Sequence, residues 1–220
     1  MYYNLNALIL NTSISSEADK TITVYTCKWG KIRAVVPSAK KIMAKLAQAT
    51  EPVTESEITI YQPGVNAKPT VTGARILNNN SDVKSDFNRY SLALYVSELS
   101  DKFAPINVPN EKKYDLISRT WQLLGSSPVP LRVLTAFSLR LLKISGYSMT
   151  DYILRESAMK KTDFFCLQKI SNCSGKELEM LEGFENGKDK IMWSYVENYI
   201  KTHVPQLSVG IFLKKIKFIN

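Results

Sequence analysis

The sequence has few of the residues from which metal and disulfide sites are built. In 220 residues there is one histidine, His203, and there are three cysteines, Cys27, Cys166 and Cys173. An odd number of cysteines without a CxxC pair argues against a disulfide framework and against a ready-made zinc site. His203 is thirty residues from Cys173, and a tetrahedral site would need a further ligand. We therefore expect no bound metal and no other cofactor.

Signals for catalysis and for membrane insertion are also missing. The nine glycines are scattered, no GxxxxGK[ST] loop occurs, and no motif joins a cysteine to the single histidine as nucleophile and base. No apolar run reaches about 18 residues, and the N-terminus lacks a basic start followed by a long apolar core. These absences predict a soluble, cytoplasmic protein that is not an enzyme.

Positive charge is what the sequence has in excess. The net charge is +9 and the isoelectric point is about 9.3, values that favour a polyanionic partner. The segment from Lys20 to Thr50 contains no acidic residue. Its seven cations are Lys20, Lys28, Lys31, Arg33, Lys40, Lys41 and Lys45. This segment is the candidate site for a nucleic-acid backbone.

The first eighty residues have the short, alternating pattern of β-strands. A tight Lys28-Trp29-Gly30 connection joins two of the strands as a hairpin, and Ser38 to Ala49 is either a helical turn or a basic loop. Five strands that must hide their edges predict a five-stranded OB-fold barrel, with an SH3-like barrel as the alternative. The predicted strands are Leu5 to Asn11, Thr21 to Cys27, Lys31 to Val36, Glu55 to Gln62 and Thr70 to Leu77.

Asn78 to Asp82 marks a change to helical periodicity, because consecutive asparagines favour a turn and Ser81 or Asp82 can cap a helix. The fold class is therefore α+β, with an OB-fold domain over residues 1–80 and an all-α domain over residues 81–220. The pattern of residues 159–187 assigns no structure. The predicted helices are Val83 to Phe103, Lys112 to Leu124, Leu131 to Ile144, Met149 to Ser157 and Lys190 to His203, followed by an apolar and basic segment from Val209 to Ile219.

Aromatic residues near the cations are candidates for stacking on bases. Trp29 lies at the hairpin tip and is the best placed. Tyr25 and Tyr61 alternate within strands, so they are expected to belong to the barrel core or to a sheet face. Trp29 and the seven cations form the predicted DNA-binding set.

The order of several short motifs is similar to that of the RecO family of bacterial recombination mediators, in which an OB-fold precedes a helical domain. In the barrel the motifs are A7-L-I-L-N-T12, E17-A-D-K20, T26-C-K-W-G-K-I-R-A-V-V36, S38-A-K-K41 and A49-T-E-P52. In the helical part they are L92-A-L-Y-V-S-E-L99 and F137-S-L-R-L-L-K-I-S-G-Y147. Two departures are visible: the two CxxC pairs of many members are absent, and the family's K-G-A-R-R loop becomes P37-S-A-K-K41, without its glycine.

The resemblance implies a nucleoid-associated DNA repair protein that hydrolyses no nucleotide. It implies binding to single- and double-stranded DNA, annealing of complementary strands, and cooperation with RecR in loading RecA onto DNA coated by single-strand-binding protein. By the same analogy, Arg132 and Arg140 are candidates for binding the acidic, apolar C-terminal tail of single-strand-binding protein. The alternative interpretation is that these arginines are solvated charges or pair with Glu98 or Asp101. An RNA-binding OB protein with a structural helical domain is the alternative function.

Overall fold

The computed structural model describes residues 1–14, 19–37, 44–64, 67–147, 149, 159–184 and 187–203. The chain divides into two compact units. The first comprises residues 1–81 together with 100–118, and the second comprises residues 82–99 together with the chain from 119 onward. Residues 100–118 therefore belong with the N-terminal strands, although residues 82–99 separate the two segments in the sequence. The sequence-based boundary at residue 81 stays a prediction.

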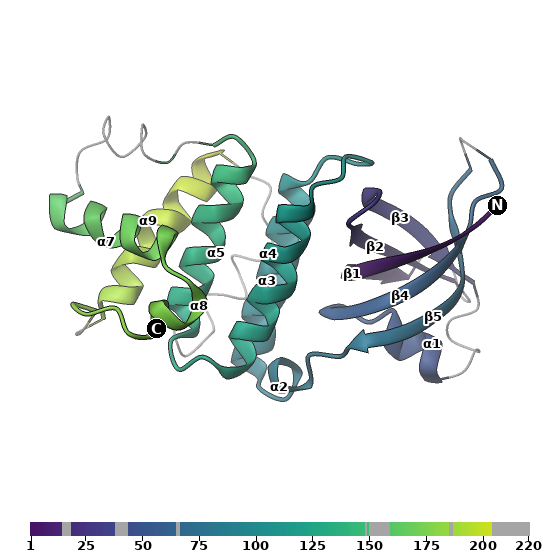
Figure 1. The fold of residues 1–220 in the computed structure, drawn as a ribbon, viewed down its shortest axis with the longest axis horizontal. Coiled ribbons are helices and arrows are strands. Elements are labelled where there is room, and N and C mark those ends of the chain that lie inside the picture. The colour runs from purple at the N-terminus through teal and green to yellow at the C-terminus, as the bar shows by residue number, and fades with distance from the viewer. Residues whose placement is uncertain are drawn as a thin grey trace. The chain divides into compact units, whose positions relative to one another are not determined.

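Five strands form a closed barrel in the first unit (Figure 1). They are β1 (Tyr2–Ile14), β2 (Lys20–Thr26), β3 (Gly30–Val36), β4 (Thr54–Tyr61) and β5 (Thr70–Asn78). Their order is β1-β2-β3-β5-β4, and β4 pairs with β1 to close the ring. All pairs are antiparallel except β3 with β5, where Val35 lies opposite Thr70. This five-stranded barrel confirms the predicted OB-fold, and all five strands lie within a few residues of their predicted positions.

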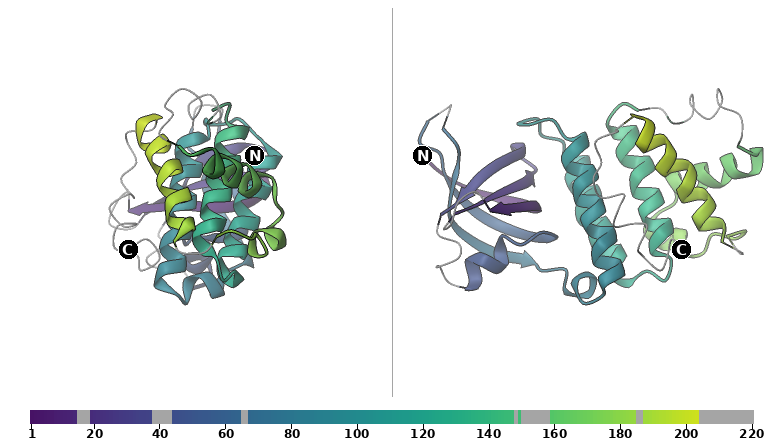
Figure 2. Two further views of the ribbon diagram at one scale, coloured as in Figure 1. Left: turned by 90° about the vertical axis from the view of Figure 1, so that its left-hand side faces the viewer. Right: turned by 180° about the vertical axis from the view of Figure 1, so that it is seen from behind.

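Alternation along the strands separates the barrel interior from its outer side. The core residues are Leu5, Ala7, Ile9, Ile22, Val24, Ile32, Ala34, Val36, Ile58, Ile60 and Val71. Helix α1 (Ala44–Ala49) lies beside the barrel between β3 and β4 in sequence (Figure 2), and its Leu46 packs against this core. The Ser56 hydroxyl donates to the Ala49 carbonyl at 2.7 Å and ties the end of α1 to β4.

The described residues from Ser81 to His203 are mainly helical. The helices are α2 (Ser81–Lys84), α3 (Phe87–Phe103), α4 (Glu111–Ser126), α5 (Pro130–Ile144), α7 (Lys161–Asn172), α8 (Gly175–Glu179) and α9 (Lys188–His203). The single helix predicted from Val83 to Phe103 is wrong in one respect, because the chain breaks at Ser85 and Asp86. The Asp86 carboxylate accepts a hydrogen bond from the Arg89 amide at 3.0 Å, so it caps a new helix instead of continuing the old one.

Helix α5 is the central element of the second unit, with α7, α8 and α9 packed against it (Figure 1). Every residue of α5 from Pro130 to Leu139 is buried, which explains its near-continuous apolarity. From α3, Tyr95 meets Trp193 of α9 edge to face, with ring centroids 5.6 Å apart. Residues 159–187, which the sequence pattern left unassigned, supply α7 and α8.

Two predicted segments fall largely or wholly outside the described residues, namely Met149 to Ser157 and Val209 to Ile219. Among the helices that the structure describes, none combines the length and the apolarity that a membrane span requires.

Candidate nucleic-acid interface

Three of the predicted cations lie on the β2–β3 hairpin with at least part of the side chain in solvent. Lys20 begins β2 and is partly buried, Lys28 is exposed in the tip of the hairpin, and Arg33 is exposed in the middle of β3. Because a seven-residue strand extends for about 23 Å, these cations are spread along the whole hairpin. Lys20 lies opposite the core residue Val36, whereas Arg33 points to the outer side of the barrel. Lys28 and Arg33 are therefore the exposed cations of the hairpin, and their separation suits the extended backbone of a nucleic acid more than a compact anion.

Lys31 is not one of these exposed cations, although the sequence placed it among them. Its residue is 8% exposed, and its ammonium donates to the main-chain carbonyl of Asp101 at 2.6 Å. The ammonium also lies 3.0 Å from the Asp101 Oδ1 atom, which accepts no hydrogen bond, so that contact is an ion pair alone. The Lys31 carbonyl accepts from the Asn107 amide at 2.9 Å. Lys31 therefore attaches residues 100–118 to the barrel and is already neutralised.

Tyr25 is also covered by residues 100–118. It is buried, and its hydroxyl donates to the Asn110 carbonyl at 3.3 Å. Burial raises the pKa of Tyr25 to about 12, and the nearby Cys27 adds to the rise. Tyr25 thus presents no face for a base, in line with the expectation from its position in a strand.

A carboxylate on β4 completes the attachment of residues 100–118. Glu55 accepts from the Tyr114 hydroxyl at 2.8 Å and from the Ser118 hydroxyl at 3.0 Å. Burial, followed by the hydrogen bond to Glu55, raises the pKa of Tyr114 above its ordinary value. Part of the outer side of the OB barrel is therefore occupied by the chain itself, and the cations that remain exposed lie beyond it.

Trp29 is only partly exposed, because its ring packs against other residues of the barrel. Its ring packs against the barrel core and meets the Tyr3 ring edge to face at a centroid distance of 4.8 Å. Its amide donates to the Thr26 hydroxyl at 3.0 Å, which shapes the hairpin tip. Trp29 lies near the exposed Lys28, but much of its indole surface is used within the protein.

The remaining DNA-binding candidates cannot be placed. Lys40 and Lys41 lie outside the described residues. Lys45 lies in α1, where the structure describes its backbone but not its side chain. Their role stays a prediction.

Arg132, which the family analogy made a candidate for binding a peptide, is not an exposed cation on α5. The residue is 4% exposed, and its guanidinium pairs with both carboxylate oxygens of Asp189, at 2.8 and 3.1 Å. It also donates to the Leu178 carbonyl at 2.7 Å and stacks on the Phe184 ring, 4.1 Å from the centroid. The partner carboxylate comes from α9, and Arg132 joins α5 to α8 and α9.

Arg140 has a comparable structural role. Its guanidinium donates to the carbonyls of Ile170, Ser171 and Cys173, at the C-terminal end of α7. A cation that binds the last carbonyls of a helix stabilises that helix end. These contacts weigh against a role of Arg132 and Arg140 in binding a peptide from another protein.

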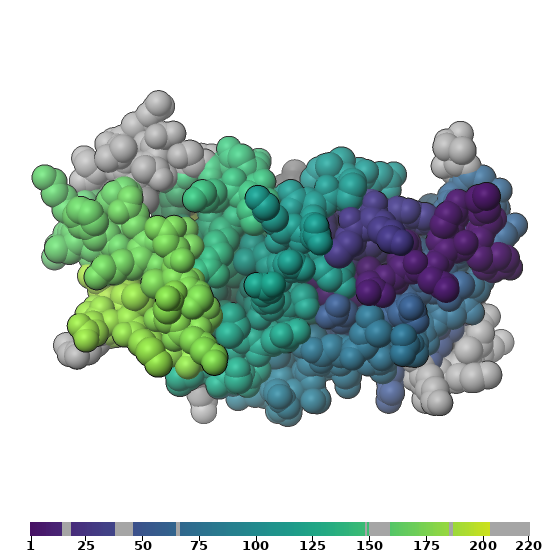
Figure 3. Space-filling view, in the orientation of Figure 1, coloured from purple at the N-terminus to yellow at the C-terminus, as the bar shows by residue number. Residues whose placement is uncertain are grey.

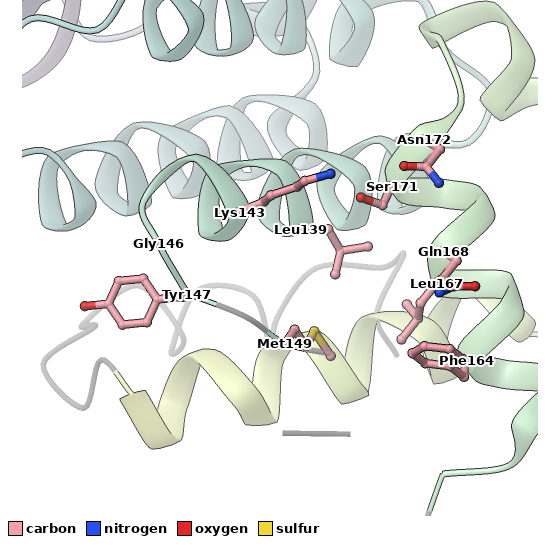
Figure 4. Close-up of a pocket in the computed structure, with 10 residues that line it drawn as sticks. All are labelled: Leu139, Lys143, Gly146, Tyr147, Met149, Phe164, Leu167, Gln168, Ser171 and Asn172. Atoms are coloured by element: carbon pink, nitrogen blue, oxygen red, sulfur yellow. The ribbon is translucent and has the colours of Figure 1, made fainter. Parts of the chain in front are cut away.

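A groove in the same unit has an exposed cation at its edge, whereas Arg132 and Arg140 are both engaged within the protein. It lies between the C-terminal half of α5 and α7, has a volume of about 420 Å³, and carries the exposed Lys143 on one side (Figure 4). In Figure 4 the Lys143 ammonium points toward the end of the groove that contains Ser171 and Asn172. The apolar lining is Leu139, Met149, Phe164 and Leu167. Sequence reasoning missed this groove, because its α7 side comes from residues to which the sequence pattern assigned no structure.

The cysteines provide no metal site within the described part of the chain, where no group of three or more His, Cys, Asp or Glu residues gathers. Cys166 and Cys173, on and just after α7, are partly buried free thiols. Burial, and then the negative charges of Asp115 and Glu111, raise the pKa of the Cys27 thiol. A raised pKa disfavours the reactive thiolate.

Comparison with known proteins gives the same family for both parts of the chain. Residues 1–79 match the family model described as "Recombination protein O N terminal", and residues 84–150 match "Recombination protein O C terminal". The chain is 32% identical over 145 residues to the DNA repair protein RecO of Heliobacterium modesticaldum and 30% identical over 146 residues to that of Desulforamulus reducens. The match to the RecO protein of Listeria monocytogenes is 27% identical over 139 residues.

These alignments cover 66%, 66% and 63% of this chain and 52%, 55% and 54% of the respective relatives. The chain thus spans about half the length of the curated relatives it matches. The two family models follow each other in order, the first on the OB barrel and the second on helices α3 to α5. The fold, the order of its parts and the sequence matches agree, and the chain belongs to the RecO family.

Proposed function

We propose that this protein is a DNA repair and recombination mediator that binds single- and double-stranded DNA and anneals complementary strands. With RecR, it helps to load RecA onto DNA coated by single-strand-binding protein in the bacterial cytoplasm, at the nucleoid. The observation that carries the proposal is the pair of exposed cations on an OB-fold hairpin, Lys28 at its tip and Arg33 on the outer side of β3. The partly buried Lys20, at the start of β2, adds a third positive charge to the same hairpin.

Electrostatics account for binding without base preference. Each lysine or arginine that neutralises a phosphate releases condensed counterions, so affinity falls steeply as salt rises. Annealing follows from the same surface, because a cationic surface that holds two strands lowers their mutual repulsion and raises their local concentration. The protein performs this function without a catalytic group.

We place the tail of single-strand-binding protein in the groove beside Lys143, in preference to Arg132 and Arg140. An acidic, apolar peptide needs an apolar slot edged by an accessible cation. Lys143 is exposed, whereas the guanidinium groups of both arginines are engaged by carboxylate or carbonyl oxygens. Leu139 and Leu167 line the slot.

The decisive experiment is an annealing assay on complementary strands that are first coated with single-strand-binding protein, with and without RecR. We expect annealing of naked strands by the protein alone and further action on coated strands when RecR is added. Failure to bind or anneal naked DNA at low salt would refute the mediator function.

The contribution of the hairpin is tested by replacing Lys20, Lys28 and Arg33 with alanine. Loss of up to three phosphate contacts should reduce the salt dependence of single-strand binding by up to about 2 in log–log slope. The control removes three exposed lysines of the helical unit, Lys160, Lys161 and Lys176. Equal effects of the two triple variants would show that net charge, and not the hairpin, governs binding.

A fluorescent peptide with the C-terminal sequence of single-strand-binding protein tests the groove. Lys143→Glu should weaken peptide binding strongly and leave naked-DNA binding nearly unchanged. Lys161→Glu is the matched control, since Lys161 is also exposed on the helical unit but does not line the groove. Retained peptide affinity in Lys143→Glu would exclude this groove.

An RNA-binding function is the alternative, because a basic OB barrel also suits RNA. Affinities for single-stranded DNA, duplex DNA and structured RNA at two salt concentrations distinguish the two. A strong preference for structured RNA would favour the alternative.

A further inference from the structure

Two exposed tyrosines lie on the outer side of the barrel, on strands that are not part of the β2–β3 hairpin. Tyr2 of β1 and Tyr61 of β4 are direct cross-strand neighbours, with 68% and 37% of their respective surfaces exposed. Their ring centroids are 5.0 Å apart and the ring planes are inclined at 42°. Figure 3 shows residues of β1 and of the β4–β5 region side by side on the visible surface. Large aromatic rings at this exposure leave π-faces open to a ligand.

The outward-facing residues next to the pair on these strands have polar, uncharged side chains. On the same outward side, Asn4 lies opposite Thr59, and the Thr59 hydroxyl donates to the Asn4 Oδ1 atom at 2.9 Å. The NH₂ group of Asn4 makes no hydrogen bond to a described residue and is available as a donor. Thr72 of β5, also exposed, extends this polar area. Rings flanked by amide and hydroxyl groups suit a base, which has a flat face and a polar edge.

The charges nearby are compatible with an anionic chain. Glu57, the nearer of the two carboxylates on this side of β4, is paired with Arg75, whose side chain is 71% exposed. Lys68, in the β4–β5 connection, is exposed. Residues 1–81 as a whole carry nine lysines and arginines against five acidic residues. A strand bound here would therefore meet a neutral platform on a positively charged barrel.

We propose that Tyr2 and Tyr61 form a stacking platform for unpaired nucleotides of a single DNA strand. This inference rests on the proposed function and adds to it a contact that only single strands can make, because the bases of a duplex are covered by their neighbours. Stacking uses the π-face of a base and leaves its Watson–Crick edge free. A strand held in this way remains able to pair with its complement, which is what annealing requires.

The main test is the double variant Tyr2→Leu, Tyr61→Leu, which keeps apolar side chains on both strands and removes the aromatic faces. We expect affinity for an oligo(dT) single strand to fall at least about fivefold, the fold-change for one stacked base at the lower limit of aromatic stacking. Duplex affinity and the salt slope of single-strand binding should not change, because no phosphate contact is removed. Phe87→Leu, which removes an exposed ring outside the barrel, is the control and should have no effect.

A second measurement does not depend on the stability of the double variant. Photocrosslinking of the unaltered protein to an oligonucleotide with iododeoxyuridine should label Tyr2 or Tyr61, located by mass spectrometry. The single variant Tyr2→Leu, at the more exposed position, should show part of the single-strand defect.

The outcomes separate this inference from the function on which it rests. If the unaltered protein binds single strands but the double variant binds them equally well, the platform is refuted and the proposed function stands. An equal loss of duplex and single-strand affinity would also refute it, because stacking cannot act on a duplex. Absence of crosslinks at both tyrosines has the same meaning. If the unaltered protein binds no DNA, the proposed function itself fails.

Discussion

Lys31 and Arg33 provide an internal test of the proposed interface. They are two residues apart on β3 and point to the same, outer side of the barrel. Arg33 is exposed, whereas Lys31 is buried against Asp101. We predict that Arg33→Ala impairs DNA binding with little loss of stability, and that Lys31→Ala impairs stability with little change in DNA binding by the folded protein.

The magnitudes follow from the surroundings of each cation. Removal of one phosphate contact lowers the log–log salt slope by about 0.7 for a single strand, which corresponds to about fivefold in affinity at 0.1 M salt. Removal of one partner of a buried ion pair costs about 3 to 5 kcal/mol. The Lys31 and Asp101 side chains are 10% and 21% exposed, so we expect about 3 kcal/mol for Lys31→Ala. If the 220-residue chain unfolds as one cooperative unit, that loss lowers the melting temperature by about 6 to 12 °C.

Two assays on each variant are sufficient. Thermal unfolding measures stability, and fluorescence anisotropy with a labelled single strand at several salt concentrations measures affinity and its slope, at a temperature where both variants are folded. A reduced salt slope in Lys31→Ala with an unchanged melting temperature would refute the assignment of Lys31 to the attachment of residues 100–118.

Three further predictions concern the architecture. Gly30→Ala should destabilise the first unit by at least about 2 kcal/mol in denaturant unfolding, because Gly30 has φ +66° and a Cβ there would lie within 3.0 Å of the Val108 carbonyl. Arg132→Ala should cost about 3 to 5 kcal/mol in the same assay, whereas Arg132→Met, which leaves a smaller cavity, should cost less. Burial by itself raises the pKa of Asp163, but the hydrogen bond and charge of Lys188 outweigh it and hold that pKa below its usual value. The stability from this pair is therefore complete above the unfolded-state pKa, near 4, and declines as pH falls through the lower folded-state value. Asp163→Asn should reduce the fall in unfolding free energy at acidic pH. An unchanged fall would contradict a stabilising role for the Asp163–Lys188 pair.

The secondary structure was largely accessible from the sequence because strand and helix periods depend on residues that are near one another in the chain. Alternation predicted all five strands, and the apolar run from Leu131 to Ile144 predicted α5. The break at Asp86 was missed because its capping bond competes with helix continuation, and periodicity does not register this competition. Residues 159–187 lacked a clear pattern because α7 buries only Asp163, Leu167 and Ile170, one of which is charged, and α8 is only five residues long.

The sequence by itself determined the OB barrel, the helical region that follows it, the excess of positive charge and the family. Only the tertiary structure decided which cations remain available to a partner. Lys31 and Arg33 have the same charge and the same strand parity, yet Asp101, seventy residues away, neutralises one and not the other. Arg132 similarly meets Asp189 across 57 residues. Exposure of a side chain is set by contacts between distant segments. For this reason the sequence showed where the positive charge lies, whereas the tertiary structure distinguishes the exposed Lys28 and Arg33 from the buried Lys31.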